Sequence, residues 1–127
     1  MSNHTADLVG KSFHASIGEP WNFESAAGQN RLEGKIQRIV FEQPGQPLIL
    51  CEVSPFLSSG KTISSIVAVN RYTSSQNLID DLSMSGSAIL NFMFQKSGKI
   101  FLAEDIEAVL NRAEDCSFLV GTMRLNP

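Results

Sequence analysis

Hydrophobic and polar residues alternate along most of this chain, in short runs separated by turn residues. Between residues 8 and 17, the side chains of Val9, Phe13, Ala15 and Ile17 share one phase, and the polar Ser12, His14 and Ser16 occupy the other. Such alternation is typical of a β-strand with one buried face. Further runs rich in alternating or β-branched residues cover residues 31–42, 48–54, 62–72, 87–95 and 117–125.

Turn chemistry separates the runs. The segment Gln43–Pro47 holds two prolines and a glycine, and glycine-containing turns occur at Ser58–Lys61 and Lys96–Lys99. The alternation blurs after Arg38, which predicts a bulge or a strong bend there. Short strands at regular intervals with turn connections indicate a barrel. We therefore predict one mainly β domain over residues 1–127, a small antiparallel β-barrel of six or seven strands, with residues 1–7 disordered.

Helix is expected in only one or two places. Residues 74–83 carry Leu78, Ile79 and Leu82 at helical spacing behind a group of Ser and Thr residues that can cap a helix. Residues 104–113 fit a second helix, but they also fit a continuation of the strand that starts at Ile100. We favour the strand, because the residues after it then form a connection to the last strand.

Composition limits the classes of function. The length of 127 residues suits one domain, and the net charge of −3 argues against a general nucleic-acid binder, although a local basic patch remains compatible with it. Arg31, Lys35 and Arg38 form a thin basic stripe, so an oligonucleotide-binding barrel ranks last among the hypotheses. No apolar run approaches the roughly 20 residues of a membrane span, and the N-terminus lacks the features of a secretory signal. We expect a cytoplasmic protein without a membrane partner.

Residue patterns that carry catalysis or bind metals are weak. The two histidines are ten positions apart, and Cys51 and Cys116 lack metal-ligand spacing and resemble small buried hydrophobes. His14 faces the polar side of its strand, where we expect a structural role. We therefore predict no catalytic residues and no metal site, and no motif requires a cofactor.

The first candidate binding site is the loop between the first two long runs. Trp21, the only tryptophan, and Phe23 lie two positions apart, so they point the same way in an extended segment. They can close one open end of the barrel as part of the core, which we favour, or form a contact surface for a partner or a planar ligand.

The second candidate is the segment Asn70, Arg71, Tyr72 and Thr73, where a strand leads into the predicted helix. Free N–H groups at a helix start and an arginine can hold a phosphate or carboxylate, although ordinary helix capping explains the same residues. The order of strand, Asn70-Arg71-Tyr72, helix and strand is similar to that of split-barrel flavin-binding domains. This resemblance implies a flavin phosphate held between the strand ends and the helix start.

Two hypotheses of function follow. The first is a non-catalytic binding or assembly module that recognises a protein or a small anionic ligand and forms a homo-oligomer. Self-association is suggested by two-sided apolar strands such as Leu48-Ile49-Leu50 and Ile89-Leu90. The second is the split-barrel alternative, a flavin- or phosphate-ligand-binding protein or an oxidoreductase.

Overall fold

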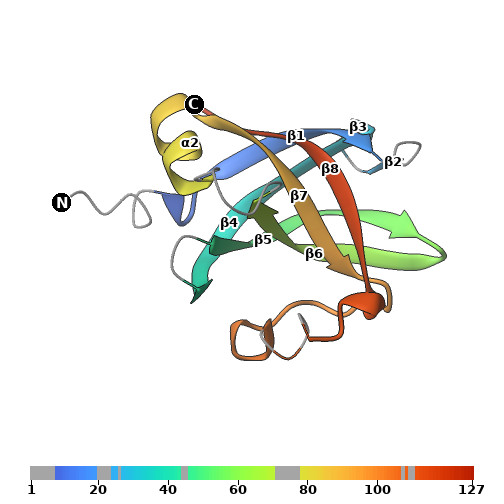
Figure 1. The fold of residues 1–127 in the computed structure, drawn as a ribbon. Helices are drawn as coiled ribbons and strands as arrows, with labels where there is room; N and C mark the ends of the chain where they lie inside the picture. Colours follow the sequence, from blue (N-terminus) through green and yellow to red (C-terminus); the bar gives the residue numbers. More distant parts are fainter. Residues whose placement is uncertain are drawn as a thin grey trace.

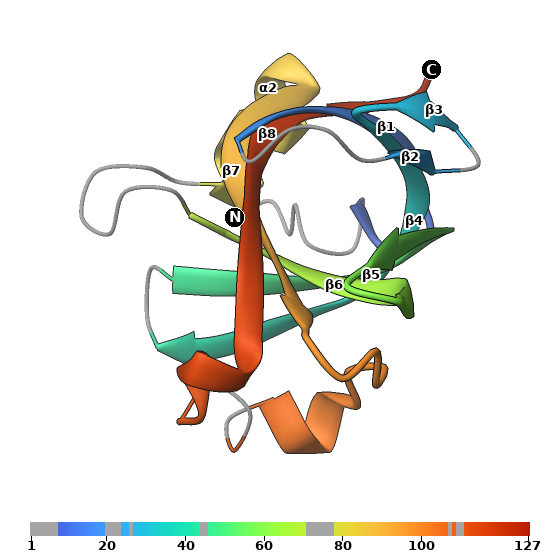
Figure 2. The ribbon, with the colours of Figure 1, turned by 90° about the vertical axis from the view of Figure 1, so that its right-hand side faces the viewer.

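Six long strands form a closed antiparallel barrel in which each strand pairs with the next one along the chain. The computed structural model describes residues 8–19, 24–25, 27–43, 46–70, 78–106, 108 and 111–127. The last barrel strand pairs with the first, which closes the ring seen in Figures 1 and 2. The predicted β-barrel is confirmed. Its strands are β1 (Ser12–Glu19), β4 (Arg31–Gln43), β5 (Gln46–Ser58), β6 (Lys61–Asn70), β7 (Ser87–Gln95) and β8 (Cys116–Leu125).

A short hairpin extends the sheet beside β5. Its two strands are β2 (Glu24–Ser25) and β3 (Gly28–Gln29), and Ser25 pairs with Phe56 of β5. The Ser25 hydroxyl accepts a hydrogen bond of 3.1 Å from the backbone N–H of Ala27, which stabilises the turn. Residues 20–23, which include the predicted site residues Trp21 and Phe23, lie outside the described residues.

The barrel interior holds the main hydrophobic core. It is built from the predicted inward phase of each strand, for example Phe13 and Ala15 of β1 and Leu32 and Ile36 of β4. The helix α2 (Leu78–Ser85) lies at one end of the barrel (Figure 1), and its buried side chains belong to the same core. The helix predicted at 74–83 is therefore confirmed over its described part. Burial of these side chains supplies most of the driving force for the fold.

Two inward-facing glycines let neighbouring strands approach closely. Gly34 of β4 stands between Leu32 and Ile36, and a Cβ at this position would collide with the backbone carbonyl oxygen of Glu52. Gly121 of β8 has the same relationship to the carbonyl of Ser16 on β1. Glycines of this kind allow a small sheet to coil tightly enough to close.

The described residues between 103 and 115, in the connection from β7 to β8, are helical or in turns, so the favoured interpretation of 104–113 as a continued strand is wrong and the alternative interpretation as helix is the better one. Ala103–Asp105 form the 3₁₀ helix η1, Ile106 and Ala108 have helical backbone, and Ala113–Asp115 form the 3₁₀ helix η2. The physical reason is that the barrel is already closed, so the sheet offers this segment no free edge with which to pair. It packs instead against the outer surface of the barrel.

This packing creates a second hydrophobic cluster on the outside of the barrel, which we call the outer cluster. It is formed by outward-facing strand residues and by two residues from the β7–β8 connection. Its buried members are Leu48, Leu50, Val67, Met93, Phe101, Ile106 and Cys116. The cluster explains why β5 is apolar on both faces: Ile49 and Cys51 point into the barrel, and Leu48 and Leu50 lie beneath the connection.

Candidate functional site

Strand β5 is irregular on both of its edges near its centre. On the β4 side, the register passes from Ile36 opposite Cys51 to Arg38 opposite Leu50, which leaves Gln37 as an extra residue. The predicted bulge is thus present, one residue before Arg38. On the β6 side, three residues of β5 (53–55) face only Ser64, and the middle of the pairing is interrupted. Bulges re-aim side chains and are common beside binding sites.

A groove of ≈ 640 Å³ lies over this irregular region, on the outside of the barrel. One wall is the barrel surface, and the other is the first part of the β7–β8 connection, residues 98–106, which we call the covering segment. The volume is within the range of ordinary ligand sites. The lining residues are Gln37, Arg38, Leu50, Glu52, Val53, Pro55, Ser64, Ser65, Ile100, Phe101, Leu102, Ala103 and Glu104.

Apolar side chains form the floor and part of the rim of the groove. Leu50 and Phe101 are buried members of the outer cluster. On the rim, Ile100 is 57% exposed and Leu102, two residues later, is 45% exposed. Leu57, 65% exposed, follows two residues after the lining residue Pro55. Concentration of exposed apolar side chains at a groove is a mark of an interaction site.

Charged groups stand on both walls. Glu52 accepts a hydrogen bond of 3.2 Å from the side-chain amide of Gln37, the bulged residue. Arg38 on the barrel wall and Glu104 on the covering segment are both exposed, and neither forms an ion pair within the described part of the chain. The groove therefore presents one cationic side chain, Arg38, and two anionic side chains, Glu52 on the barrel wall and Glu104 on the opposite wall.

Hydrogen bonds hold the covering segment in place, so the groove is formed before any ligand arrives. The backbone N–H of Phe101 donates to the buried hydroxyl of Ser65 at 3.0 Å. The side-chain amide of Gln95 donates to the carbonyl oxygens of Lys99 and Ile100 at 3.2 and 3.1 Å. A pre-formed site costs little ordering entropy on binding.

Of the six predicted site residues, the structure describes only Asn70. Asn70, half-buried at the end of β6 opposite Leu90, does not line the groove. Arg71, Tyr72 and Thr73 lie outside the described residues, as Trp21 and Phe23 do. The anion-binding and flavin hypotheses that depend on them stay predictions. Sequence reasoning missed the groove because its residues come from four distant segments; the blurred alternation near Arg38 was the one local signal.

Both cysteines sit in environments that keep the thiol protonated. Complete burial of Cys51 inside the barrel raises the pKa of its thiol far above the ordinary value, and its sulfur lies 3.6 Å from the carbonyl oxygen of Ile49. Burial, and secondarily the Asp115 carboxylate, raises the pKa of the Cys116 thiol, against the opposing charges of Lys96 and Arg112. A raised pKa makes a thiol a poor nucleophile and a poor metal ligand.

His14 is held by a hydrogen bond on the outer surface of β1. Its Nδ1 lies 2.8 Å from the Oδ1 of Asn126, and the Asn126 side-chain amide donates to the hydroxyl of Ser12 at 3.2 Å. Because Asn126 uses its amide nitrogen toward Ser12, its oxygen is the acceptor, and His14 Nδ1 carries the proton. Among the residues that the structure describes, no group of three His, Cys, Asp or Glu side chains is arranged to hold a metal ion.

The described helices include none with the length and apolar character needed to cross a membrane. In comparisons with known proteins, no protein-family model, no curated protein and no solved structure matches this chain.

Proposed function

We propose that this protein is a non-catalytic binding module, and that the groove beneath the covering segment receives a short extended peptide segment of a partner protein. The observation that carries the proposal is the groove itself. It combines an apolar floor with two exposed aliphatic side chains, Ile100 and Leu102, on its rim. A partner that buries these side chains removes apolar surface from water, which favours association.

The polar groups of the groove suit a peptide. Arg38 and Glu104, on opposite walls, complement a segment that carries both an acidic and a basic group. The regular pairing between β5 and β6 is interrupted over residues 53–55 beside the groove, and an extended peptide offers backbone N–H and carbonyl groups that can pair with strand backbone.

The lining supports binding rather than catalysis. No histidine occurs among the described lining residues. The Ser65 hydroxyl accepts a hydrogen bond from the Phe101 N–H, and among the described residues it makes no hydrogen bond to a side chain that could act as a general base. Glu52 is engaged by Gln37. A nucleophile oriented by a general base, which acyl transfer requires, is not assembled from these side chains.

Selection of random peptides displayed on phage, followed by NMR titration of an enriched peptide, tests the proposal. We expect enriched peptides with adjacent apolar residues and shifts concentrated at the amides of Ser64, Ser65 and Leu102. Ile100→Asp and Leu102→Asp, both at exposed positions, should each weaken binding about tenfold or more. Met84→Asp, at an 81% exposed position on α2, is the matched control and should leave binding unchanged. Perturbations that map to another surface would contradict the proposal.

Self-association is the second proposal, and of the two apolar segments that suggested it only the one that contains Ile89 still supports it. Leu48 and Leu50 are covered within the chain by the outer cluster. Exposed apolar side chains remain on the outer surfaces of β7 and β8, where Ile89 is 52% exposed and Phe118 is 43% exposed. Sedimentation of the wild type and of Phe118→Ser tests a dimer through this surface; a wild type that stays monomeric at high concentration removes it.

A further inference from the structure

The outer surface of β4, β1 and β8 is basic, although the whole protein is acidic. We propose that this surface binds the phosphate backbone of single-stranded nucleic acid without sequence preference, as a second interaction site that adjoins the groove at Lys35 of β4. We call it the basic face and define it by Arg31, Lys35 and Arg124, with the hydroxyl-bearing residues Ser12, Ser16 and Thr122 between them.

The strand registers place these side chains in rows. Arg31 of β4 pairs with Ser16 of β1, which pairs with Thr122 of β8. In the next row, Glu33, His14 and Arg124 lie side by side. In the third row, Lys35 pairs with Ser12, whose backbone carbonyl and hydroxyl accept hydrogen bonds from Asn126.

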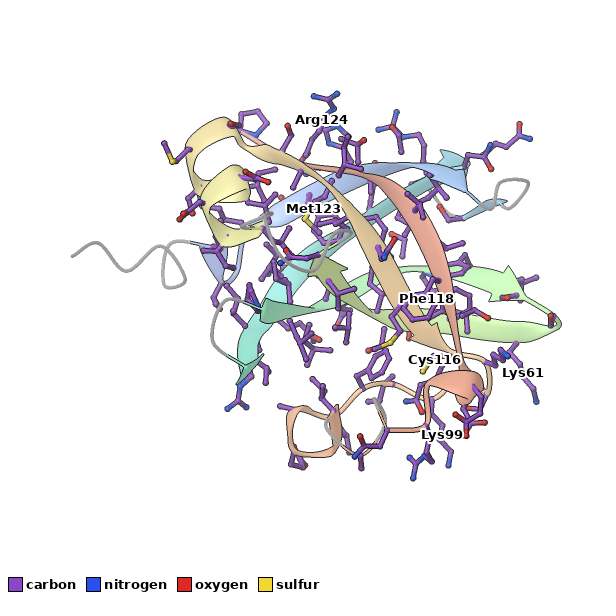
Figure 3. The ribbon with its side chains drawn as sticks, in the orientation of Figure 1. Lys61, Lys99, Cys116, Phe118, Met123 and Arg124 are labelled. Carbon is purple, nitrogen blue, oxygen red and sulfur yellow. The ribbon has the colours of Figure 1, made fainter. Side chains whose placement is uncertain are left out.

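Geometry makes this surface continuous. The opposite faces of the same strands supply Phe13, Leu32 and Met123 to the barrel core, so the members of the rows point outward. Arg31, Lys35 and Arg124 are exposed, and Figure 3 shows Arg124 directed away from the barrel. Strand rise and strand spacing put these three cations about 12–13 Å apart. Their fields overlap at low ionic strength, where the Debye length reaches about 30 Å, and are largely screened from one another at physiological salt, where it is about 8 Å.

Cations outnumber carboxylates on this surface, although the protein as a whole has 10 basic and 13 acidic residues. Among the acidic residues with described side chains, Glu33 lies within the basic face, and Glu52 of β5 pairs with Lys35 at its edge. The backbone carbonyl oxygen of Lys11 accepts a hydrogen bond of 2.9 Å from the N–H of Ile36. This bond places Lys11, which is exposed, at the end of the rows, where its side chain adds a further positive charge. The net charge of −3 therefore does not argue against nucleic-acid binding at this surface, because a polyanion responds to the local potential of the surface that it meets.

The chemistry of the rows favours a nucleic-acid backbone over an anionic membrane. Serine, threonine and asparagine side chains are regular donors to phosphate and sugar oxygens. Membrane-surface binding needs several apolar side chains that insert among the lipids, and among the exposed large hydrophobics of the described residues only Ile89, which pairs with Thr122, is shown by the strand pairing to border the rows.

A single strand fits better than a duplex. The outer surface of a six-stranded barrel is convex (Figure 2), and a flexible strand can follow it, whereas a duplex is stiff over this distance and touches it along one line. The rows carry no Phe, Tyr or Trp side chain on which bases could stack, and the single imidazole of His14 is held by Asn126, so binding should be weak and insensitive to sequence.

Fluorescence anisotropy with a labelled oligothymidylate of about 15 nucleotides tests the inference. We expect a dissociation constant of roughly 10⁻⁴ to 10⁻⁵ M at low salt, and a slope of log K against log salt of about −2 for three phosphate contacts. The combined variant Arg31→Gln, Lys35→Gln, Arg124→Gln should lose at least about tenfold in affinity and most of this slope.

The matched control variant removes three positive charges from a different part of the protein surface. Lys61 and Lys99 lie together at the other end of the barrel (Figure 3), and Arg112, which forms an exposed ion pair of 3.9 Å with Asp115, follows them along the chain. The combined variant Lys61→Gln, Lys99→Gln, Arg112→Gln should keep wild-type affinity within about twofold. Equal losses in both variants overturn the inference, because they show a response to net charge alone. The inference is also overturned if the protein does not bind the oligonucleotide but does bind vesicles that contain phosphatidylserine, since that result indicates a membrane-binding surface.

Discussion

The backbone N–H of Phe101 donates a hydrogen bond of 3.0 Å to the hydroxyl of Ser65, 36 residues earlier in the chain. This bond joins the covering segment to the outer surface of β6 at the point where the pairing of β6 with β5 is interrupted. Both groups are buried, so neither has ready access to water. The bond therefore decides whether the groove has a fixed second wall.

Ser65→Ala should lower the free energy of unfolding by about 1–2 kcal/mol, because it leaves a buried N–H without an acceptor. The Phe101 amide should also exchange with solvent about tenfold or more faster, as the covering segment opens more often. Chemical denaturation and NMR hydrogen exchange measure the two effects. Ser64→Ala is the control, since the Ser64 hydroxyl makes no comparable bond within the described residues, and its effect should stay below about 0.5 kcal/mol. Equal exchange rates in both variants would contradict this role.

Closure of the barrel gives a second prediction. Gly34→Ala and Gly121→Ala should each destabilise the protein by about 2–3 kcal/mol, because a new Cβ meets the backbone carbonyl of Glu52 or Ser16, which cannot move without shifting a strand. Thermal unfolding measures the loss. Gly18→Ala provides the comparison within β1: its nearest neighbouring atom, the Val120 carbonyl oxygen, lies at 3.8 Å, an ordinary contact. A Gly34→Ala protein as stable as Gly18→Ala would show that the strands are not packed this closely.

The alternation of side chains was enough to predict the barrel. Phe13, Leu32 and Ile36 each lie on the buried phase of their strands, and the helix around Leu78 carries its apolar stripe into the same core. These features depend on local periodicity, which a single sequence displays directly. The segment after Ile100 was ambiguous for the same reason: its periodicity fits two structures, and only closure of the sheet elsewhere excludes the strand.

The groove could not be predicted in the same way. It depends on two register irregularities of β5, one on each side of Glu52. It also depends on the path of the covering segment, in which Phe101 bonds to Ser65, 36 residues earlier in the chain. From the sequence, an apolar residue on the outward face of a strand, such as Leu50, indicates an interface with another subunit. The neighbouring residues do not show that a distant segment of the same chain covers it. The basic face was only partly visible, since Arg124 joins Arg31 and Lys35 through the pairing of β8 with β1.

Packing of aromatic rings inside the barrel gives a third prediction. Phe56 and Phe94 make an edge-to-face contact with ring centroids 5.4 Å apart and an interplanar angle of 88°. Phe94→Leu should cost about 1–3 kcal/mol, from the lost contact and the lost volume. The double variant Phe56→Leu, Phe94→Leu should cost less than the sum of the two single variants, because one interaction is removed in both. Additive losses in a denaturation cycle would argue against a direct coupling of the two rings.

Burial of Cys51 predicts how stability depends on pH in mildly alkaline solution. The thiol of the unfolded chain ionises near about pH 8.5, whereas burial keeps the folded thiol protonated to a much higher pH. Above pH 8.5 the unfolded state therefore binds fewer protons than the folded state, and stability falls as the pH rises. Between about pH 8.5 and 9.5, Cys51 should contribute a loss of about 1 kcal/mol, measured by denaturant unfolding under reducing conditions. Cys51→Ala should lower stability at neutral pH through the lost side-chain contacts and flatten this decline, whereas Cys116→Ala should flatten it less. A decline that persists unchanged in Cys51→Ala would mean that another group controls stability in this range.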